Sequence, residues 1–513
     1  MLNTHLLSIV TFLPVLAVIV LAIIPGRQEK ALKQFSIGFA IIHFLLSILL
    51  VTNFDSSVYK IQFEEIIPWF STQFASVGYH IGLDGINLWI VMLTTFLGPI
   101  IFLSVYSSIT KKVKSFLINM FLLEVGILGS LVALNTFLFY LFWEVMLIPM
   151  YFIIGVWGGE RRIYAAVKFF IYTMAGSLLM LVAIIYMYLQ TGTFELMDLY
   201  THTFSGQEQV YLFAAFAIAF AIKVPIFPFH TWLPDAHTEA PTAGSVILAG
   251  VLLKLGTYGF IRFAMPLFPS AVKTFAPYVI VLGIIGIIYG ALVAMVQKDV
   301  KKLVAYSSVS HLGYVMVGLF ALTIYSVQGA MLQMINHGIS TGALFLLVGI
   351  VYERTHTRLI SEYGGIAKVM PVYAVLFMIF TLSSIGLPMT NGFIGEFLIL
   401  MGTFKSAYPY AFWYAAFAAV GVILGAVYML WMYQRVFFNI EPSEKNMKLK
   451  DANLRERIYL LPLLIMVFWI GLYPSFFLKR MDKSVEHYMK LIQPGTQLVV
   501  PDPTAAVDEG VQK

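Results

Sequence analysis

Long apolar runs recur along the whole chain and constrain its fold more than any other feature. An α-helix needs about 20 apolar residues to cross a bilayer, so each run predicts one membrane helix. We therefore expect an all-α membrane protein with about fourteen transmembrane helices. The expected spans are residues 5–25, 31–53, 84–108, 115–134, 136–158, 163–190, 209–229, 241–264, 274–296, 301–322, 326–352, 371–400, 409–438 and 457–478.

The composition agrees with a membrane protein. Hydrophobic residues make up 60% of the chain and charged residues only 11%, whereas soluble proteins carry about 25% charged residues. The net charge of +6 comes from short basic loops, so we expect membrane lipids and no nucleic acid as partners. The run Leu6–Ile24 has no basic segment before it and ends at Pro25-Gly26, which predicts a first membrane helix rather than a signal peptide.

Redox groups and metals have few candidate ligands in this sequence. There is no cysteine, which excludes disulfides and cysteine-bound iron–sulfur clusters. Neither a GxGxxG nor a P-loop pattern is present. His230 and His237, with Asp235 and Glu239 nearby, lack the spacing of a zinc site. We expect this chain to bind no cofactor and no metal, and any redox chemistry to take place on partner subunits.

The basic residues indicate how the helices are oriented. Because cytoplasmic loops of membrane proteins are enriched in Lys and Arg, clusters on one side of the map test the helix count. Arg262, Lys273, Lys479 and Arg480 are exceptions. The pattern places both termini outside and the basic loops in the cytoplasm. The clusters are Arg27/Lys30/Lys33, Lys111/Lys112/Lys114, Arg161/Arg162/Lys168, Lys298/Lys301/Lys302, Arg354/Arg358/Lys368 and Lys445 to Arg457.

Two stretches of the chain look like copies of each other. Ile222–Pro225 resembles Ile385–Pro388, and Gly250–Lys254 resembles Gly421–Gly425. Each copy would hold five helices, and consecutive copies with an odd number of helices lie in opposite orientations, as in transporters with broken helices. The alternative is that Gly and Pro are simply common in membrane helices.

This repeat divides the chain into four expected segments. They are an N-terminal three-helix segment (1–114), a first repeat (115–265), a second repeat (266–440), and a final loop, helix and polar tail (441–513). We expect the tail, from Lys490 on, to be poorly ordered.

Charged and titratable residues inside the apolar runs are the strongest functional signal. A charge at the bilayer centre costs at least about 2.5–3.5 kcal/mol, so these residues should face the protein interior or a water-filled cavity. Lys223 precedes a predicted helix break, and lysine can release a proton where arginine cannot. Histidine can relay a proton through either ring nitrogen. The candidates are Glu144, Lys223, Lys254, His311, His337 and Glu396.

Structural roles for the same residues remain open. Glu144 and Lys223 are expected to pair, and such a pair can be a purely structural bridge. Either histidine can be a hydrogen-bonded core residue, and Lys254 and Glu396 can likewise be structural. Three further charges receive simpler interpretations: Glu124 is expected to snorkel or to pair with a lysine, Lys168 to snorkel, and Asp84 to cap a helix.

Several passages closely resemble the M-subunit (NuoM) family of bacterial respiratory complex I, which includes the fourth mitochondrial NADH dehydrogenase chain. The passage from Lys223 is very specific to the antiporter-like superfamily. The matching passages are Phe142–Met150, Lys223–Val246, Lys302–Tyr314, Asn336–Phe345 and Gly386–Phe397.

The resemblance implies a proton-translocating subunit of the membrane arm in the bacterial inner membrane, with both termini in the periplasm. NADH, FMN, iron–sulfur clusters and quinone would lie in partner subunits, and the neighbours would be NuoL-like and NuoN-like subunits. The family's functional residues match Glu144 on helix five, Lys223 at the broken helix, Lys254 at the centre, His311 and His337 as connections, and Glu396 as the terminal acid. The NuoL and NuoN relatives typically carry a lysine at this last position.

Three rival functions stay open. A sodium/proton antiporter subunit of the Mrp type would share the fold and the lysines but have no redox partner. A membrane-bound hydrogenase subunit and a purely structural scaffold are the others, although the buried charges argue against a scaffold. The neighbouring genes would distinguish the antiporter and the hydrogenase from a quinone reductase, because each complex has its own set of genes.

Overall fold

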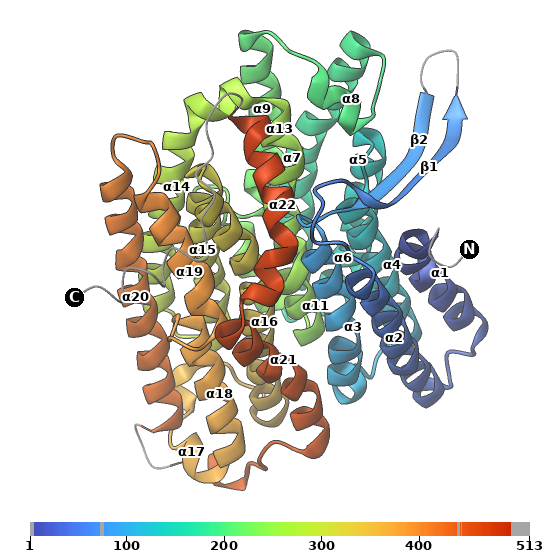
Figure 1. The fold of residues 1–513 in the computed structure, drawn as a ribbon. Coiled ribbons are helices and arrows are strands. Elements are labelled where there is room, and N and C mark those ends of the chain that lie inside the picture. The colour runs from blue at the N-terminus through green and yellow to red at the C-terminus, as the bar shows by residue number, and fades with distance from the viewer. Residues whose placement is uncertain (1–4, 72–75, 439–441, 443, 494–513) are drawn as a thin grey trace.

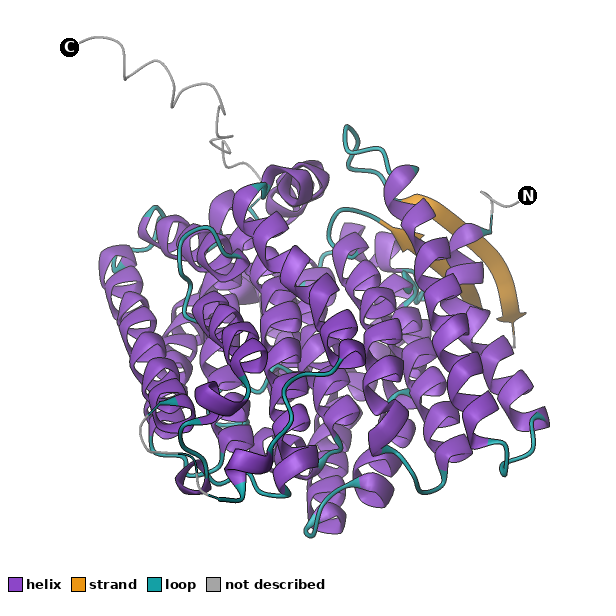
Figure 2. Ribbon diagram, turned by 90° about the horizontal axis from the view of Figure 1, so that it is seen from below, coloured by secondary structure: helices purple, strands orange, loops and turns teal. Residues whose placement is uncertain are grey.

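The computed structural model describes residues 5–71, 76–438, 442 and 444–493, and most of them are helical. The helices form one bundle, and a β-hairpin lies at its edge near the N-terminus (Figures 1 and 2). From residue 494 on, the tail that we expected to be poorly ordered lies outside the described residues.

Eleven helices of the described part are long and apolar enough to cross a membrane, and a twelfth is added if one bent pair counts as a single span. The bent pair is α21 (Leu454–Leu472) with α22 (Ser475–Ile492), which meet at 67°. The eleven are α1 (Leu6–Ile23), α2 (Glu29–Thr52), α3 (Leu88–Ser108), α4 (Val113–Val132), α5–α6 (Thr136–Trp157), α7 (Arg162–Thr191), α11–α13 (Thr242–Leu267), α14 (Pro269–Met295), α15 (Val300–Phe320), α16 (Ile324–Thr355) and α20 (Ala411–Phe437).

The expected count of about fourteen spans is not confirmed, because two of them are broken. Residues 209–229 fall on α9 (Gly206–Lys223) and the break after it, which α10 (Trp232–Glu239) follows. Residues 371–400 fall on α18 (Pro371–Ser384) and α19 (Asn391–Phe404). Both breaks are where the sequence predicts them. Three expectations stay predictions. They are that these broken helices cross the membrane, that the two similar stretches belong to an inverted repeat, and that the chain divides into four segments.

Proline and glycine explain the breaks. Pro225 and Pro228 follow α9 and have no N–H to continue the helical hydrogen bonds. After α18, Gly386 adopts φ +73°, a left-handed conformation that glycine adopts without strain. A third break separates α5 (Thr136–Val145) from α6 (Leu147–Trp157), where Pro149 cannot donate to the carbonyl of Val145.

The end of the chain departs from the prediction as well. The expected span 457–478 ends at Leu472, and Pro474 precedes the new helix α22, which runs in another direction. The remaining short elements are α8 (Leu196–Thr201), α17 (Ile366–Val369), η3 (Ile360–Glu362) and η4 (Asn446–Lys448).

A two-stranded hairpin corrects the expectation of an entirely helical chain. β1 (Gln62–Ser71) and β2 (Ser76–Leu83) pair antiparallel in a region that the sequence leaves as a loop. The next helix therefore starts at Leu88 rather than at residue 84, and its N-cap position is Asn87, not Asp84. Asp84 instead accepts hydrogen bonds from the backbone of the turn and pairs with Arg262.

His80 fastens the hairpin to the bundle. Its ring nitrogens lie 2.6 Å from a carboxylate oxygen of Glu195 and 2.9 Å from one of Glu64. Burial would lower the pKa of His80, but the hydrogen bonds and charges of these two carboxylates outweigh burial and raise it above its ordinary value of 6.5.

The attachment of the hairpin should weaken as the pH rises. Because the folded-state pKa of His80 exceeds that of an unfolded histidine, its stabilisation is complete below pH 6.5 and is lost as the pH rises through the raised pKa. Hydrogen exchange of residues 77–83, corrected for intrinsic base catalysis, should lose protection as the pH rises above 6.5 through the raised pKa of His80. H80N should remove this pH dependence. An equal loss of protection in H80N would assign the effect to another group.

Candidate functional site

Lys254 lies at the centre of the bundle with no exposed surface. It is part of α12 (Leu253–Gly259), between two π-helical turns, η1 (Leu248–Leu252) and η2 (Phe260–Ala264). A π turn shifts the hydrogen-bond ladder by one residue and is frequent at functional sites. The Lys254 ammonium donates to the carbonyl of Ala249 and lies 2.7 Å from Nδ1 of His337 on α16.

A line of polar side chains continues from His337 to Glu396. The rings of His337 and His311 lie with their centroids 5.9 Å apart. Nδ1 of His311 is 3.2 Å from Oε1 of Glu396 on α19, and its Nε2 is 3.1 Å from the Ser384 hydroxyl. Gln333 also donates to Glu396, at 3.1 Å.

A cavity of about 10 Å³ lies beside both histidines. Its lining includes the polar side chains of Gln333, Asn336 and Ser340, and its volume is close to what a single water molecule needs. Water there would bridge the one step of the line, His337 to His311, that has no direct hydrogen bond. Four of the six predicted residues are thus brought together: Lys254, His337, His311 and Glu396.

Glu144 and Lys223 interact electrostatically but do not form the predicted ion pair. Lys223 ends α9 with its side chain buried, and Glu144 lies half-buried near the end of α5. The carboxylate acts electrostatically on the ammonium, but in the described residues no ion pair within 4.0 Å joins them. The Lys223 ammonium instead lies 5.1 Å from the Trp143 ring and has no hydrogen-bond partner there.

Lys223 and Lys254 are not hydrogen-bonded to each other, but the backbones of the helices that carry them are in close contact. An ideal Cβ on Gly256 of α12 would lie 2.8 Å from both the Phe220 carbonyl and the Val224 nitrogen at the end of α9. The glycine lets the helix of Lys254 pack directly on the break that follows Lys223. A change in the α9 break would therefore be transmitted to the helix that carries Lys254.

His237 is a candidate that the sequence reasoning set aside. It lies on α10 with no exposed surface, stacks on Phe345 at 4.6 Å, and has no hydrogen bond to either ring nitrogen among the described residues. It interacts electrostatically with Lys254 and with Lys301. The sequence feature that could have indicated His237 is its position in the helical segment that follows the break after Lys223. No group of three or more potential metal ligands occurs in the described residues.

Lys301 connects His237 to the surface. Its ammonium donates to the Ala240 carbonyl at 2.5 Å and borders a cavity of about 140 Å³, which Glu239 and Arg358 also line. This cavity lies at the ends of helices next to the basic loops that the sequence assigns to the cytoplasm. Lys301 therefore borders this cavity and also interacts electrostatically with the buried ring of His237.

Two other buried charges have partners that differ from the predictions. Glu124 pairs with His43 of α2 at 3.1 Å instead of snorkelling or meeting a lysine. Lys168 does not simply snorkel, because it forms an ion pair with Asp235 at 2.8 Å.

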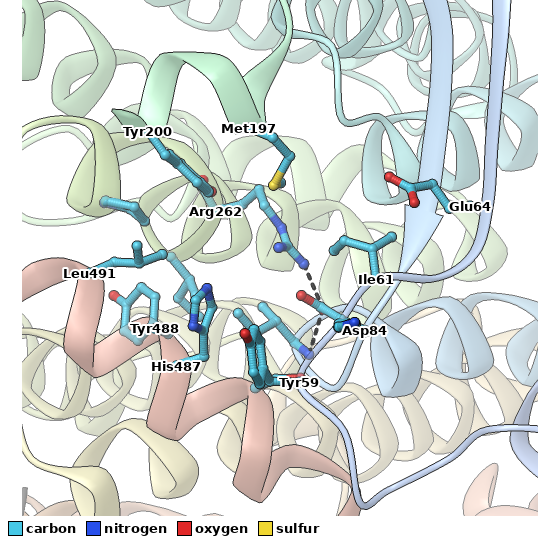
Figure 3. A pocket seen from close by; sticks show the side chains of 15 residues that line it. Tyr59, Ile61, Glu64, Asp84, Met197, Tyr200, Arg262, His487, Tyr488 and Leu491 are labelled. Atoms are coloured by element: carbon cyan, nitrogen blue, oxygen red, sulfur yellow. Dashed lines mark hydrogen bonds and ion pairs between the residues drawn. The ribbon is translucent and has the colours of Figure 1, made fainter. Parts of the chain in front are cut away.

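A pocket of about 310 Å³ lies beside the hairpin, on the side opposite the basic loops (Figure 3). Arg262 and Asp84 form an ion pair of 2.6 Å in its wall, and His487 of α22 stacks on Tyr59 at 4.4 Å. Arg262 follows Lys254 by two helical turns along the same span. A guanidinium does not release its proton in proteins, so Arg262 itself cannot relay a proton into this pocket.

The comparisons with known proteins identify the family. The profile of the family described as NADH:quinone oxidoreductase/Mrp antiporter, TM, matches residues 133–424, which is more than half of the chain. This chain belongs to that family. The matched segment contains all six predicted site residues.

Its relatives cover nearly the whole chain. It is 45% identical over 504 residues to NADH-quinone oxidoreductase subunit M of Rhodobacter capsulatus, covering 95% of this chain and 96% of that protein. It is 44% identical over 485 residues to NADH-ubiquinone oxidoreductase chain 4 of Marchantia polymorpha, covering 94% and 97%. The family member is therefore similar to the M-type branch along its full described length.

Solved structures confirm the antiporter-like fold. A chain of respiratory complex I from Thermus thermophilus with bound NADH superposes with a TM-score of 0.86 at 32% identity, covering 95% of this chain and 100% of that chain. A chain of the membrane-bound sulfane sulfur reductase, an archaeal respiratory membrane complex, gives a TM-score of 0.81 at 25% identity, covering 91% and 76%.

The close approach of α12 to α9 makes a prediction about stability. G256A should destabilise the protein by about 1–3 kcal/mol, because its methyl group would overpack against Phe220 and Val224. The matched control is G425A in α20, where nothing lies within 4 Å of the added Cβ. The thermal unfolding midpoint of the purified protein should fall in G256A and stay the same or rise in G425A. Equal midpoints for the two variants would contradict the packing argument.

Proposed function

We propose that this chain is the M-type membrane-arm subunit of a bacterial NADH:quinone oxidoreductase and that it translocates protons. NADH, FMN, iron–sulfur clusters and quinone would be bound by other subunits, with NuoL-like and NuoN-like chains as its neighbours. The membrane would be the bacterial inner membrane, with both termini periplasmic. The observation that carries the proposal is the buried line from Lys254 through His337 and His311 to Glu396.

The line has the chemistry of a proton relay. A proton on the Lys254 ammonium can pass to Nδ1 of His337, which lies within hydrogen-bond distance. Water beside the two histidines would carry it to His311, and the His311–Glu396 contact would pass it to the carboxylate. Moving one proton against 100 mV costs about 2.3 kcal/mol, which NADH oxidation in the partner subunits would supply.

Uptake is proposed from the side of the basic loops. Lys301 and His237 lie between the cavity at that side and Lys254, so they would reload Lys254 after each transfer. Release is proposed beyond Glu396. The Arg262–Asp84 pair supports this choice, because the arginine in the wall of the pocket beside the hairpin does not release its proton.

Glu144 and Lys223 would act as the switch. An approaching carboxylate favours the charged form of a lysine, and its withdrawal favours proton release. The open arrangement of the two side chains leaves room for them to close under the field of a neighbouring subunit. The charge on Lys223 would then alter the proton affinity of Lys254, whose helix packs on the same break.

The Mrp-type antiporter remains the second candidate, because the family that includes this chain is described by both names. The full-length similarity to proteins named subunit M favours complex I. Sodium uptake driven by a pH gradient, in membranes without NADH, would favour the antiporter.

Replacing the switch residues tests the proposed function. K223A and E144A should lower NADH-driven proton uptake by inverted membrane vesicles at least about tenfold, because the relay loses its control group. Quinone reduction should fall with it. K405A, which removes an exposed lysine, is the matched control and should behave as wild type.

Assembly of the complex must first be confirmed for each variant. Wild-type NADH oxidation and proton uptake in assembled K223A and E144A would show that the function or the role of this pair is wrong.

A further inference from the structure

An apolar cavity of about 410 Å³ lies between α2, α3, α16 and the α21–α22 bend, away from the polar line. Its lining is aromatic and aliphatic and includes Phe44, Trp89, Leu93, Ile339, Met466 and Phe477. A cavity without polar partners does not hold water well. Because α2 and α3 are long and apolar enough to cross a membrane, the molecules that reach this cavity are the acyl chains of the bilayer.

The α22 helix places one end of this cavity at a membrane surface. α22 contacts the first turn of α3 through Trp89 and Phe477, the first turns of α16 through Gln328 and Asp482, and the end of α13 through Tyr488 and Met265. These contacts all lie at the same end of the bundle. α22 therefore lies across that end rather than along the spans, as an amphipathic surface helix does.

Arg480 of α22 lies at the rim of the cavity, and its guanidinium group is only partly satisfied by hydrogen bonds and has no ion-pair partner among the described residues. Its guanidinium carbon lies 4.1 Å from the centroid of the Phe476 ring and 5.9 Å from that of Trp89, and both rings line the cavity. Nη1 donates to the Phe476 carbonyl, but Nε has no partner. No carboxylate of the described residues pairs with Arg480.

The nearby acids of α22 already have other partners. Asp482 accepts a hydrogen bond from Gln328 at 2.6 Å, and Glu486 pairs with Lys483 at 3.0 Å. The charge at the rim is thus positive and available. Guanidinium groups bind phosphate oxygens through several N–H donors at once, and tryptophan is typical of the bilayer interface where lipid phosphates lie.

We propose that this cavity binds one acyl chain of a membrane phospholipid whose phosphate is held by Arg480. The apolar volume accommodates the chain, and the guanidinium at the surface end meets the phosphate of the same molecule. The bound chain would lie beside the bend between α21 and α22. The site is independent of the proton relay, since none of the six relay residues lines it.

The test compares phospholipid retained by the purified intact complex after delipidation in detergent and re-addition of phosphatidylglycerol. R480Q should retain one phospholipid fewer per complex than wild type, because the phosphate ligand is lost. M92W should show the same deficit with Arg480 intact, because the larger side chain occupies part of the space that the acyl chain needs. R435Q is the matched control: Arg435 also stacks on a tryptophan and has an unpartnered nitrogen, but it lines none of the cavities described above.

Wild-type retention in either R480Q or M92W would overturn the proposal. A deficit of the same size in R435Q would also overturn it, since any surface arginine would then suffice. The unmodified complex gives a second measurement that does not depend on how the variants fold. Phosphatidylglycerol with a photoreactive group in its acyl chain should crosslink to residues 44–52, 89–96 and 462–477, and crosslinks confined to the outer faces of α1 and α20 would contradict the site.

Discussion

The burial of Lys254 is the constraint on which the rest of the structure depends. An ammonium group at the centre of a membrane bundle is costly unless the protein supplies its partners. Here the partners are the Ala249 carbonyl and the His337 ring. The π turn beside Lys254 contributes the carbonyl, and α16 contributes the histidine. From His337 the polar contacts continue to His311 and Glu396, so satisfying one buried charge organises four helices around a single line.

Helix breaks and close packing serve this line. The break after α9 exposes Lys223 at a helix end, and Gly256 allows α12 to pack against it. The break after α18 lets Ser384 and Glu396 meet His311 from two sides. In the membrane, non-helical backbone is tolerated only where the protein or a water-filled cavity surrounds it. The two breaks lie beside the residues that the proposed function assigns to the switch and to the relay.

Much of this architecture could be predicted because it follows from hydrophobicity. The apolar runs gave the spans, Pro225 and Gly386 marked the breaks, and the cost of intramembrane charge singled out the six site residues. Contacts between residues that are far apart in the sequence could not be predicted in this way. Glu124 meets His43 from another helix, and the Glu144–Lys223 pair is open because its distance depends on how α5 and α9 pack. The hairpin was missed because its strands lie in an acidic and aromatic segment that has no long apolar run and was expected to be a loop. His237 was missed because its Pro-rich surroundings resemble a surface loop.

The central claim is that protons pass along the line from Lys254 to Glu396. The most direct test is NADH-driven proton uptake by inverted vesicles that contain assembled complex with H337L. Leucine is similar in size to the imidazole ring but accepts and donates no proton, and it removes the only side-chain contact of Lys254 in the line. The account predicts that proton uptake falls well below wild type. Uptake at the wild-type rate in the assembled variant would show that protons take another path.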